Sequence, residues 1–350
     1  MPSLKDDMES NPSVIQSFTR YVAKDTAFAA EYEDAFCVGL EQGRAAIADG
    51  VSSAIFSGRW ARILVKSVVE NPPDLEQPAG WVHWLADPRR RWLEEIDFAR
   101  MPTHQKNKLR QVGGAYCTLC WVEFLAIPDS DADGPRWSLR AHAMGDSCIL
   151  YLRSGQLLAS FPMTNSAEFD LDPDSICSVA TSRDGQQRLA STQIECQDGD
   201  VIVMITDAIG KWMLDSIECG SLAPWEQLWS LDESEWIAAI EHLRDTNAMK
   251  RDDTTMVVLQ VGSGTPVWSL PRPALNEDAE LLPIDEDVDE SEAVANTAAI
   301  VVDATDNSES EIQFEEFGIE EDGEPPLETT NVVEVPVNSE PTEGNPTEQR

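Results

Sequence analysis

The sequence predicts an α+β fold in which helices are layered against antiparallel β-sheets. Ten short segments have the alternating or continuously apolar pattern of β-strands. Several are separated by turns as short as Arg153-Ser154-Gly155, which favours hairpins over the crossover helices of a parallel sheet. The helical segments are fewer and lie between blocks of strands, and helices grouped in this way indicate separate layers.

The strand candidates are justified by their composition and by the residues that end them. They are rich in β-branched and aromatic residues, which suit a pleated, partly buried surface, and turn-forming residues separate them. In chain order the predicted strands are Val14–Val22, Ala35–Leu40, Arg44–Ala48, Gly114–Ile127, Trp137–Ala143, Cys148–Arg153, Gln156–Phe161, Ser191–Cys196, Val201–Thr206 and Thr254–Val261.

Three segments have the period of a helix. From Ala54 to Val69 apolar residues recur at steps of four, and Pro72-Pro73 then ends the segment. Trp81–Arg110 is a weaker helical stretch, which we expect Pro88 and Pro102 to interrupt. Near the end of the apolar part of the chain, a last helix is indicated by the stripe Trp236, Ile237, Ile240 and Leu243.

The charge of the chain is concentrated at its carboxyl-terminal end. The 350 residues include 64 acidic and 25 basic ones, which gives a net charge of −39. Residues 271–350 alone contain 24 acidic and 2 basic residues and show no amphipathic period. Such a segment cannot bury enough apolar area to offset the entropy of ordering it. We therefore expect a folded domain over residues 1–265 and an acidic disordered tail over residues 266–350.

The charge and the apolar pattern argue against several classes of protein. A surface this negative repels phosphate backbones and anionic lipids, so we expect neither a nucleic-acid nor a membrane partner. The longest apolar run, Ala115–Ile127, is too short to span a bilayer, and the amino terminus lacks the pattern of a secretory signal. Seven cysteines at irregular spacing are simplest to explain as reduced thiols, so we expect a cytoplasmic protein.

Acidic residues stand where apolar strands meet loops. Asp49 and Asp207 each follow a strand, whereas Glu33-Asp34 and Asp252-Asp253 each precede one. A carboxylate at such a junction is held by rigid backbone and remains reachable from solvent. If these positions converged, they would repel one another strongly unless a cation neutralised them. Carboxylate ligands of this kind suit Mg²⁺ or Mn²⁺.

Each of these acids also has a purely structural explanation. Asp49-Gly50 is a common turn pair, and Glu33-Asp34 fits a solvated loop. Asp252-Asp253 would serve as a charged strand edge that blocks aggregation, and Asp207 would cap a following helix. The position of these acids at strand ends does not decide between a metal site and these structural roles.

Five acidic motifs occur in a particular order between residues 14 and 262. They are Glu33-Asp34-Ala35-Phe36, Ala48-Asp49-Gly50, Gly145-Asp146-Ser147, Thr206-Asp207-Ala208 and Asp252-Asp253-Thr254-Thr255. Together they resemble the type 2C family of metal-dependent Ser/Thr protein phosphatases, and residues 144–162 and 206–214 resemble a bacterial branch of it. The resemblance implies a four-layer αββα sandwich, with two central antiparallel sheets flanked by helices.

The resemblance also implies a centre of two, or up to three, Mn²⁺ or Mg²⁺ ions. Carried over by motif, Asp49 would bridge two metals, Glu33 and the carbonyl of Gly50 would bind one, and Asp207 and Asp252 the other. Asp146 matches an aspartate of a weaker third site. The catalytic residues would be Asp49 and Asp34, the latter orienting metal-bound water. A hydroxide that bridges the metals would attack the phosphorus of phosphoserine or phosphothreonine.

The chain departs from the family pattern at three positions. Many members have an arginine four residues before the first motif's glutamate, where this chain has Ala29, so Lys24 or Arg59 is the candidate ligand of the substrate phosphate. Ala208 replaces a glycine and Asp253 replaces an asparagine, and neither change removes a predicted metal ligand.

The leading functional hypothesis is a bacterial, cytoplasmic phosphoprotein phosphatase that acts with a Ser/Thr kinase or on its targets. The main alternative is a catalytically silent phosphatase-like module that binds a phosphorylated partner or a kinase, which the missing arginine at position 29 motivates. A third hypothesis is an acidic scaffold or nucleic-acid mimic built on residues 271–350.

Overall fold

Two five-stranded antiparallel sheets form the centre of the fold in the computed structural model. The structure describes residues 15–26, 31–77, 79–127, 136–170, 173–182, 184, 189–221, 224–262 and 265–268. Sheet A has the order β1 (Ile15–Val22), β12 (Thr254–Val261), β11 (Val201–Ile205), β7 (Cys148–Arg153) and β8 (Gln156–Phe161). Sheet B has the order β10 (Ala190–Cys196), β6 (Arg136–Met144), β5 (Leu119–Ile127), β3 (Arg44–Ala48) and β2 (Ala35–Gly39).

All ten predicted strands are present, but one of them is divided. The segment predicted as Gly114–Ile127 forms β4 (Tyr116–Cys117) and then β5, with Thr118 between them. β4 leaves sheet B and pairs with β9 (Ile176–Cys177), a two-residue strand that the sequence analysis did not predict. Two residues are too few for a periodic signal.

The helices differ more from the prediction. The described residues form α1 (Ser57–Glu70), α2 (Gly80–Glu95), α3 (Thr103–Val112), α4 (Asp207–Glu218), α5 (Pro224–Trp229), α6 (Glu233–Asp245) and the 3₁₀ turn η2 (Ser166–Asp170). Pro102 does separate α2 from α3, but the expectation that Pro88 interrupts the helix is wrong, because α2 runs through it. Proline inside a helix costs about 3 kcal/mol. Pro88 is itself buried, and the burial of Leu85 and Trp92 on either side of it offsets that cost.

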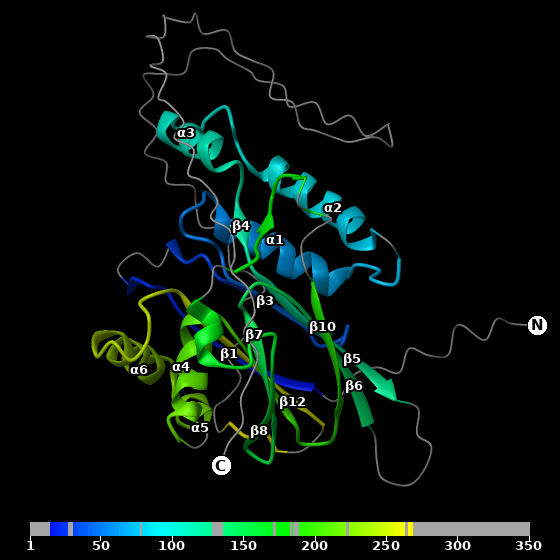
Figure 1. The fold of residues 1–350 in the computed structure, drawn as a ribbon, viewed down its shortest axis with the longest axis vertical. Helices are drawn as coiled ribbons and strands as arrows, with labels where there is room; N and C mark the ends of the chain where they lie inside the picture. The colour runs from blue at the N-terminus through cyan, green and yellow to red at the C-terminus, as the bar shows by residue number, and fades with distance from the viewer. Residues whose placement is uncertain are drawn as a thin grey trace, which may run out of the picture. The chain divides into compact units, whose positions relative to one another are not determined.

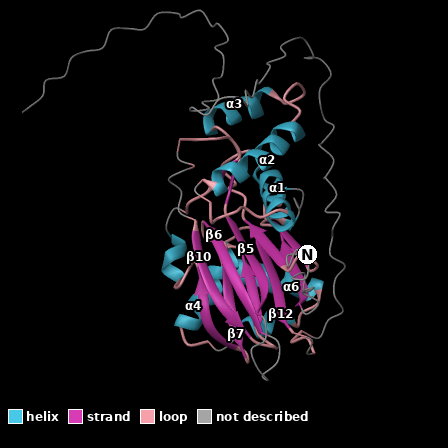
Figure 2. Ribbon diagram, turned by 90° about the vertical axis from the view of Figure 1, so that its right-hand side faces the viewer, coloured by secondary structure: helices cyan, strands magenta, loops and turns pink. Residues whose placement is uncertain are grey.

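Three apolar layers hold these elements together. Inward-facing side chains of both sheets, including Ile47, Val122 and Val257, fill the space between the sheets. α1 and α2 cover the outer face of sheet B through residues such as Trp60. α4, α5 and α6 cover the outer face of sheet A through residues such as Trp236. The order of layers is therefore α, β, β, α, and the predicted four-layer sandwich is confirmed (Figures 1 and 2).

The described chain continues a short way beyond β12. Trp268 is buried and its ring lies 4.9 Å from that of Phe18, so this residue still packs on sheet A. Residues 269–350 lie outside the described part of the chain, and both the boundary at residue 265 and the disordered tail stay predictions. Among the described residues, no helix has the length and apolar character needed to cross a membrane.

Candidate metal centre

Strand pairing brings the predicted acidic residues to one end of the sandwich. In sheet A, Ile205 is paired with Cys148, and Val22 with Thr254. In sheet B, Ala35 is paired with Ala48, and Leu119 with Met144. The loops that carry Glu33-Asp34, Asp49-Gly50, Asp146, Asp207 and Asp252-Asp253 therefore all leave the sheets at this end, although they are up to 220 residues apart in the chain.

Asp34 is the most deeply buried of these acids, with 1 % of its surface exposed. Its Oδ2 accepts hydrogen bonds from Thr206 Oγ1 at 3.0 Å and Thr255 Oγ1 at 2.7 Å. Both threonines stand at ends of sheet A strands, whereas Asp34 directly precedes a strand of sheet B. Its Oδ1 has no partner among the described residues. Burial, and then the charge of Asp253, raise the pKa of Asp34 well above its ordinary value.

Asp49 ends β3 and faces the same cluster. Its backbone is fixed by Thr118, whose hydroxyl accepts from Asp49 N at 3.1 Å and whose N–H donates to Asp49 O at 2.8 Å. Burial raises the pKa of Asp49 well above its ordinary value, and the charges of Asp34, Asp207, Asp146 and Asp252 raise it further. The structure therefore brings these four carboxylates within electrostatic reach of Asp49.

Close backbone packing explains why glycine follows Asp49. A Cβ on Gly50 would lie 2.6 Å from Glu33 O, and a Cβ on Gly58 would lie 2.9 Å from Glu33 Cα. Two glycines thus let the Glu33-Asp34 segment lie directly against Asp49-Gly50 and the first turn of α1. The simple Asp-Gly turn that the sequence left open is not what forms here, since Gly50 makes a β-bridge with Cys117.

Asp253 is a site residue that the motif comparison treated only as a departure. Its Oδ1 accepts from Lys24 N at 2.7 Å, and its Oδ2 accepts from Glu33 N at 2.6 Å. Asp253 therefore ties the end of β1 to the segment that carries Glu33 and Asp34. A carboxylate accepts with both oxygens, whereas an asparagine in the same orientation would accept with one. The aspartate at position 253 therefore accepts one hydrogen bond more than an asparagine would.

Asp207 and Asp252 are joined by a lysine. Lys250 Nζ lies 2.9 Å from Asp207 Oδ2 and 2.7 Å from Asp252 Oδ2. Burial disfavours the charge of Lys250, but the two carboxylates outweigh that effect and hold its pKa above the ordinary value for lysine. Asp207 is the first residue of α4 and Thr206 is its cap residue, so Asp207 begins the helix and does not cap it as the structural alternative proposed.

Asp146 lies in the turn between β6 and β7. Gly145 has φ +94°, and a Cβ there would lie 2.5 Å from Thr118 Cγ2, so only glycine fits. Asp146 is 6 % exposed, and its Oδ1 has no partner among the described residues. Burial, and then the charge of Asp207, raise its pKa to about 7.

The two candidates for phosphate binding have different surroundings. Lys24 Nζ lies 2.9 Å from Glu33 Oε2 and donates to Ser52 Oγ at 2.8 Å, so its ammonium is beside the acidic cluster. Arg59 donates to Glu95 O at 2.8 Å and lies over the Phe56 ring at 5.6 Å. These contacts link α1 to the end of α2, and no interaction found among the described residues joins Arg59 to the cluster.

The donor set suits a hard divalent cation, although the ligands are not gathered into a cage. Within the described ranges, no three His, Cys, Asp or Glu side chains lie close enough together to hold a metal ion as they stand. Lys24 and Lys250 instead neutralise Glu33, Asp207 and Asp252. The free Oδ1 atoms of Asp34 and Asp146 are buried, however, and a carboxylate oxygen without a partner is costly. A cation and its bound waters would satisfy both.

Comparison with known proteins gives matches to solved structures. No family model matches the chain, and no curated protein sequence does. The serine/threonine phosphatase PstP/Ppp of Mycobacterium tuberculosis matches at 16 % identity and a TM-score of 0.44, over 71 % of this chain and 100 % of that one. The PstP catalytic domain in complex with two manganese ions matches at 16 % identity and a TM-score of 0.43, over 71 % of this chain and 99 % of that one.

A third match is PppA, a regulatory component of T6SS in Pseudomonas aeruginosa, at 18 % identity and a TM-score of 0.42, over 71 % of this chain and 98 % of that one. At such identities and scores, what this chain binds or hydrolyses has to be decided from its own residues. Several of the solved structures to which its fold is similar are described as Ser/Thr phosphatases, among them PstP of Mycobacterium tuberculosis and MsPP of Mycobacterium smegmatis.

Proposed function

We propose that this protein is a metal-dependent phosphoprotein phosphatase of type 2C, which hydrolyses phosphoserine and phosphothreonine esters. The observation that carries the proposal is the buried Oδ1 of Asp34, a carboxylate oxygen without a partner among the described residues in the middle of a cluster of further carboxylates. Protein interiors satisfy buried carboxylate oxygens, and those left free are candidates for binding or catalysis.

The residues that would hold the metals are those that the motifs predicted. One half of the centre would be formed by Glu33 and the carbonyl of Gly50, and the other by Asp207 and Asp252. Asp49 would contribute to both halves. Asp146, with its free Oδ1, would contribute to a third site. Two Mn²⁺ or Mg²⁺ ions would, when bound, lower the pKa of water and neutralise the charge of the phosphate.

The chain's own residues set the geometry of the reaction. Thr206 and Thr255 fix Asp34 through Oδ2, which leaves Oδ1 directed to accept a hydrogen bond from water in the site. Asp253 fixes the backbone of Glu33, and Thr118 fixes that of Asp49. Lys24 is the better supported phosphate ligand of the two candidates, because its ammonium is beside Glu33, whereas Arg59 is bonded to Glu95.

The test is phosphate release from p-nitrophenyl phosphate and from a phosphothreonine peptide, in Mn²⁺ and in EDTA. We expect turnover in Mn²⁺ only, and a loss of about 100-fold or more in Asp49→Asn and Asp207→Asn, since each removes a charge on which metal binding depends. Asp198→Asn, on an exposed turn, is the matched control and should retain full activity. Equal activity in EDTA, or none on either substrate, would contradict the proposal.

One observation favours the silent binding module as a second candidate. Lys24 and Lys250 pair with three of the predicted ligands, so the chain's own lysines balance part of the charge of the acidic cluster, and a module that binds without turnover needs no more than that. Calorimetry separates the candidates: tight binding of a phosphoprotein without turnover in Mn²⁺ supports the module, and turnover excludes it. A cytoplasmic location and a partnership with a Ser/Thr kinase are part of the leading proposal.

A further inference from the structure

The ammonium of Lys250 lies where a cation is expected in the second half of the centre. Its contacts with Asp207 and Asp252 use the Oδ2 atom of each carboxylate, at 2.9 and 2.7 Å. The side chains of these aspartates are 13 % and 23 % exposed, whereas that of Lys250 is 58 % exposed. The lysine thus enters the acidic cluster from the solvent side.

The backbone around Lys250 is fixed, so its side chain is held near these carboxylates. Asp252 N donates to Lys250 O at 3.1 Å, and the buried side chain of Arg244 donates to Asp252 O and, at 3.0 Å, to Thr254 Oγ1. A charge tethered within the same turn has a high effective concentration at its partner.

Arg251, the next residue, points elsewhere. Its guanidinium pairs with Glu241 at 3.2 Å and with Asp245 at 2.7 Å, both on α6. Neither acid is a predicted metal ligand. The turn therefore carries two adjacent cations of equal charge, one bonded to the predicted ligands and one not.

We propose that Lys250 is a built-in competitor of the divalent cation at the Asp207–Asp252 half of the centre. The inference rests on the proposed function, because it concerns the regulation of that metal site. The Oδ1 atoms of Asp207 and Asp252 accept hydrogen bonds from Ala208 N and Asp253 N, so a metal that binds both residues competes with Lys250 for the Oδ2 atoms. A nearby ammonium also repels the metal. The lysine has to leave before this half can fill.

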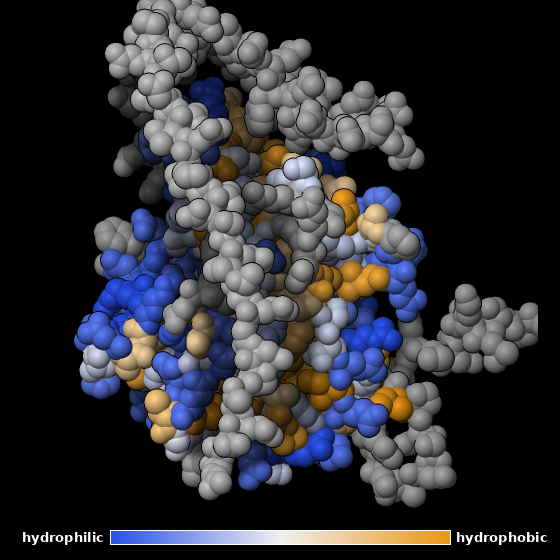
Figure 3. Space-filling model, viewed as in Figure 1, coloured by the Kyte–Doolittle hydropathy of each residue, from blue (hydrophilic) through white to orange (hydrophobic). Residues whose placement is uncertain are grey.

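Displacement of Lys250 is feasible because its side chain is already more than half exposed. The surface over α6, which leads into this turn, is mostly hydrophilic, so a released ammonium would be hydrated (Figure 3). Ion pairs as exposed as these are weak. Because the metal has to break two of them in order to bind, they raise its dissociation constant about 3- to 10-fold. Lys250 would thus set the metal concentration at which the second half fills.

The test is calorimetric titration of the full chain with MnCl₂ alone, comparing Lys250→Met, Lys250→Arg and Arg251→Met with the wild type. Methionine is unbranched and only one atom shorter than lysine, and its thioether is too soft to bind Mn²⁺ well. We expect Lys250→Met to tighten Mn²⁺ binding at the Asp207–Asp252 half about 3- to 10-fold. Arg251→Met, which removes an equal charge from the same turn, should change this affinity less than about 2-fold. Lys250→Arg keeps the positive charge beside Asp207 and Asp252 and should not tighten Mn²⁺ binding.

Two results would overturn this inference and leave the proposed function intact. One is Mn²⁺ binding of equal strength in Lys250→Met and the wild type. The other is equal tightening in Arg251→Met, which would reveal a general effect of charge. If the wild type and Lys250→Met both failed to bind Mn²⁺, the metal centre itself would be refuted and the inference with it.

Discussion

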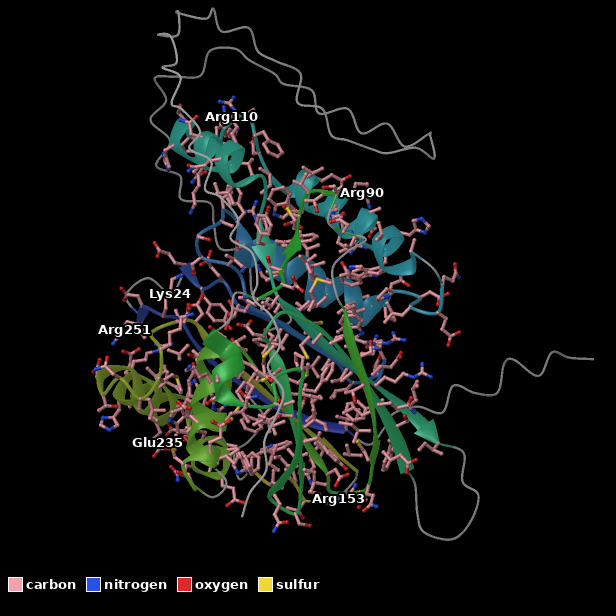
Figure 4. All side chains as sticks on the ribbon, viewed as in Figure 1. Lys24, Arg90, Arg110, Arg153, Glu235 and Arg251 are labelled. Atoms are coloured by element: carbon pink, nitrogen blue, oxygen red, sulfur yellow. The ribbon has the colours of Figure 1, made fainter. Side chains whose placement is uncertain are left out.

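Each end of the β-sandwich buries an aspartate, and the two differ in what satisfies them. Figure 4 shows Lys24 and Arg251 near one end of the sandwich and Arg153 near the other. Asp34 belongs to the first end, where its neighbour Glu33 pairs with Lys24, and Asp200 to the second, where it pairs with Arg153. Both are 1 % exposed. Asp200 accepts from Arg153 on both oxygens, from Tyr151 Oη at 2.6 Å and from Gln197 N at 2.7 Å. Asp34 has partners on Oδ2 alone.

The difference shows that burial of a carboxylate does not by itself indicate a functional site. At the Asp200 end, the protein supplies an arginine, a phenol and a backbone N–H, so this buried charge is part of the scaffold. At the Asp34 end, the charges of other carboxylates raise the pKa of Asp34 and Asp49 further after burial has done so. The feature that favours cation binding is therefore a buried carboxylate oxygen that has no hydrogen-bond partner among the described residues and has other negative charges beside it.

The largest expected effect concerns Asp49. Asp49→Asn should lower the affinity for Mn²⁺ about 100-fold or more, because it removes a carboxylate on which the charges of four other acids act. Without metal, the variant should be as stable as the wild type or more so by about 1 kcal/mol, since like-charge repulsion is relieved. Calorimetry and urea unfolding measure the two quantities. A large loss of stability without metal would instead make Asp49 a scaffold residue like Asp200.

Asp200→Asn should give the opposite pattern. We expect the free energy of unfolding to fall by about 2 kcal/mol, because Arg153 and Tyr151 lose a charged acceptor in a mostly buried site. Mn²⁺ affinity should stay within about 2-fold of the wild type, as the residue lies at the other end of the strands. Asp198→Asn on the same exposed turn should change neither quantity. Loss of Mn²⁺ binding in Asp200→Asn would remove the distinction between the two ends.

The smallest expected effect sharpens the comparison within the Asp34 end. Thr255→Val removes the hydroxyl that donates to Asp34 Oδ2 and should weaken Mn²⁺ binding about 3- to 10-fold, with a cost in stability of about 1 kcal/mol. Thr19→Val on β1 is the matched control, because Thr19 Oγ1 is buried and has no partner among the described residues. Its loss should be neutral or stabilising. Equal changes in both variants would mean that Thr255 does not position Asp34.

Much of the fold was predictable because strands leave a local signal. Arg44–Ala48, Cys148–Arg153, Gln156–Phe161 and Thr254–Val261 form strands with the predicted bounds. The misplaced elements are those where tertiary packing outweighs local preference. Pro88 is carried inside α2 by the packing of Leu85 and Trp92, and β9 exists only because β4 pairs with it. α4 had a signal that was not used, since Ile209, Met213 and Ile217 recur at steps of four.

The acidic residues of the candidate site could be predicted from the sequence, whereas the residues that contact and position them could not. Five ordered motifs named the carboxylates, because their positions at strand ends are written in the local sequence. Thr118, Asp253 and Lys250 were not assigned roles, since each acts on a residue that is distant in the chain or faces it only in the folded turn.

The sequence by itself therefore determined the strands and which acidic residues lie at their ends. The order of its motifs also indicated the four layers. Only the tertiary structure decided which of their oxygens stay free. That outcome depends on Thr206 and Thr255 reaching Asp34 from the opposite sheet, and on two lysines reaching Glu33, Asp207 and Asp252. Hydrogen bonds and ion pairs act over a few ångströms. Their partners are therefore determined only once the strand register of both sheets is established.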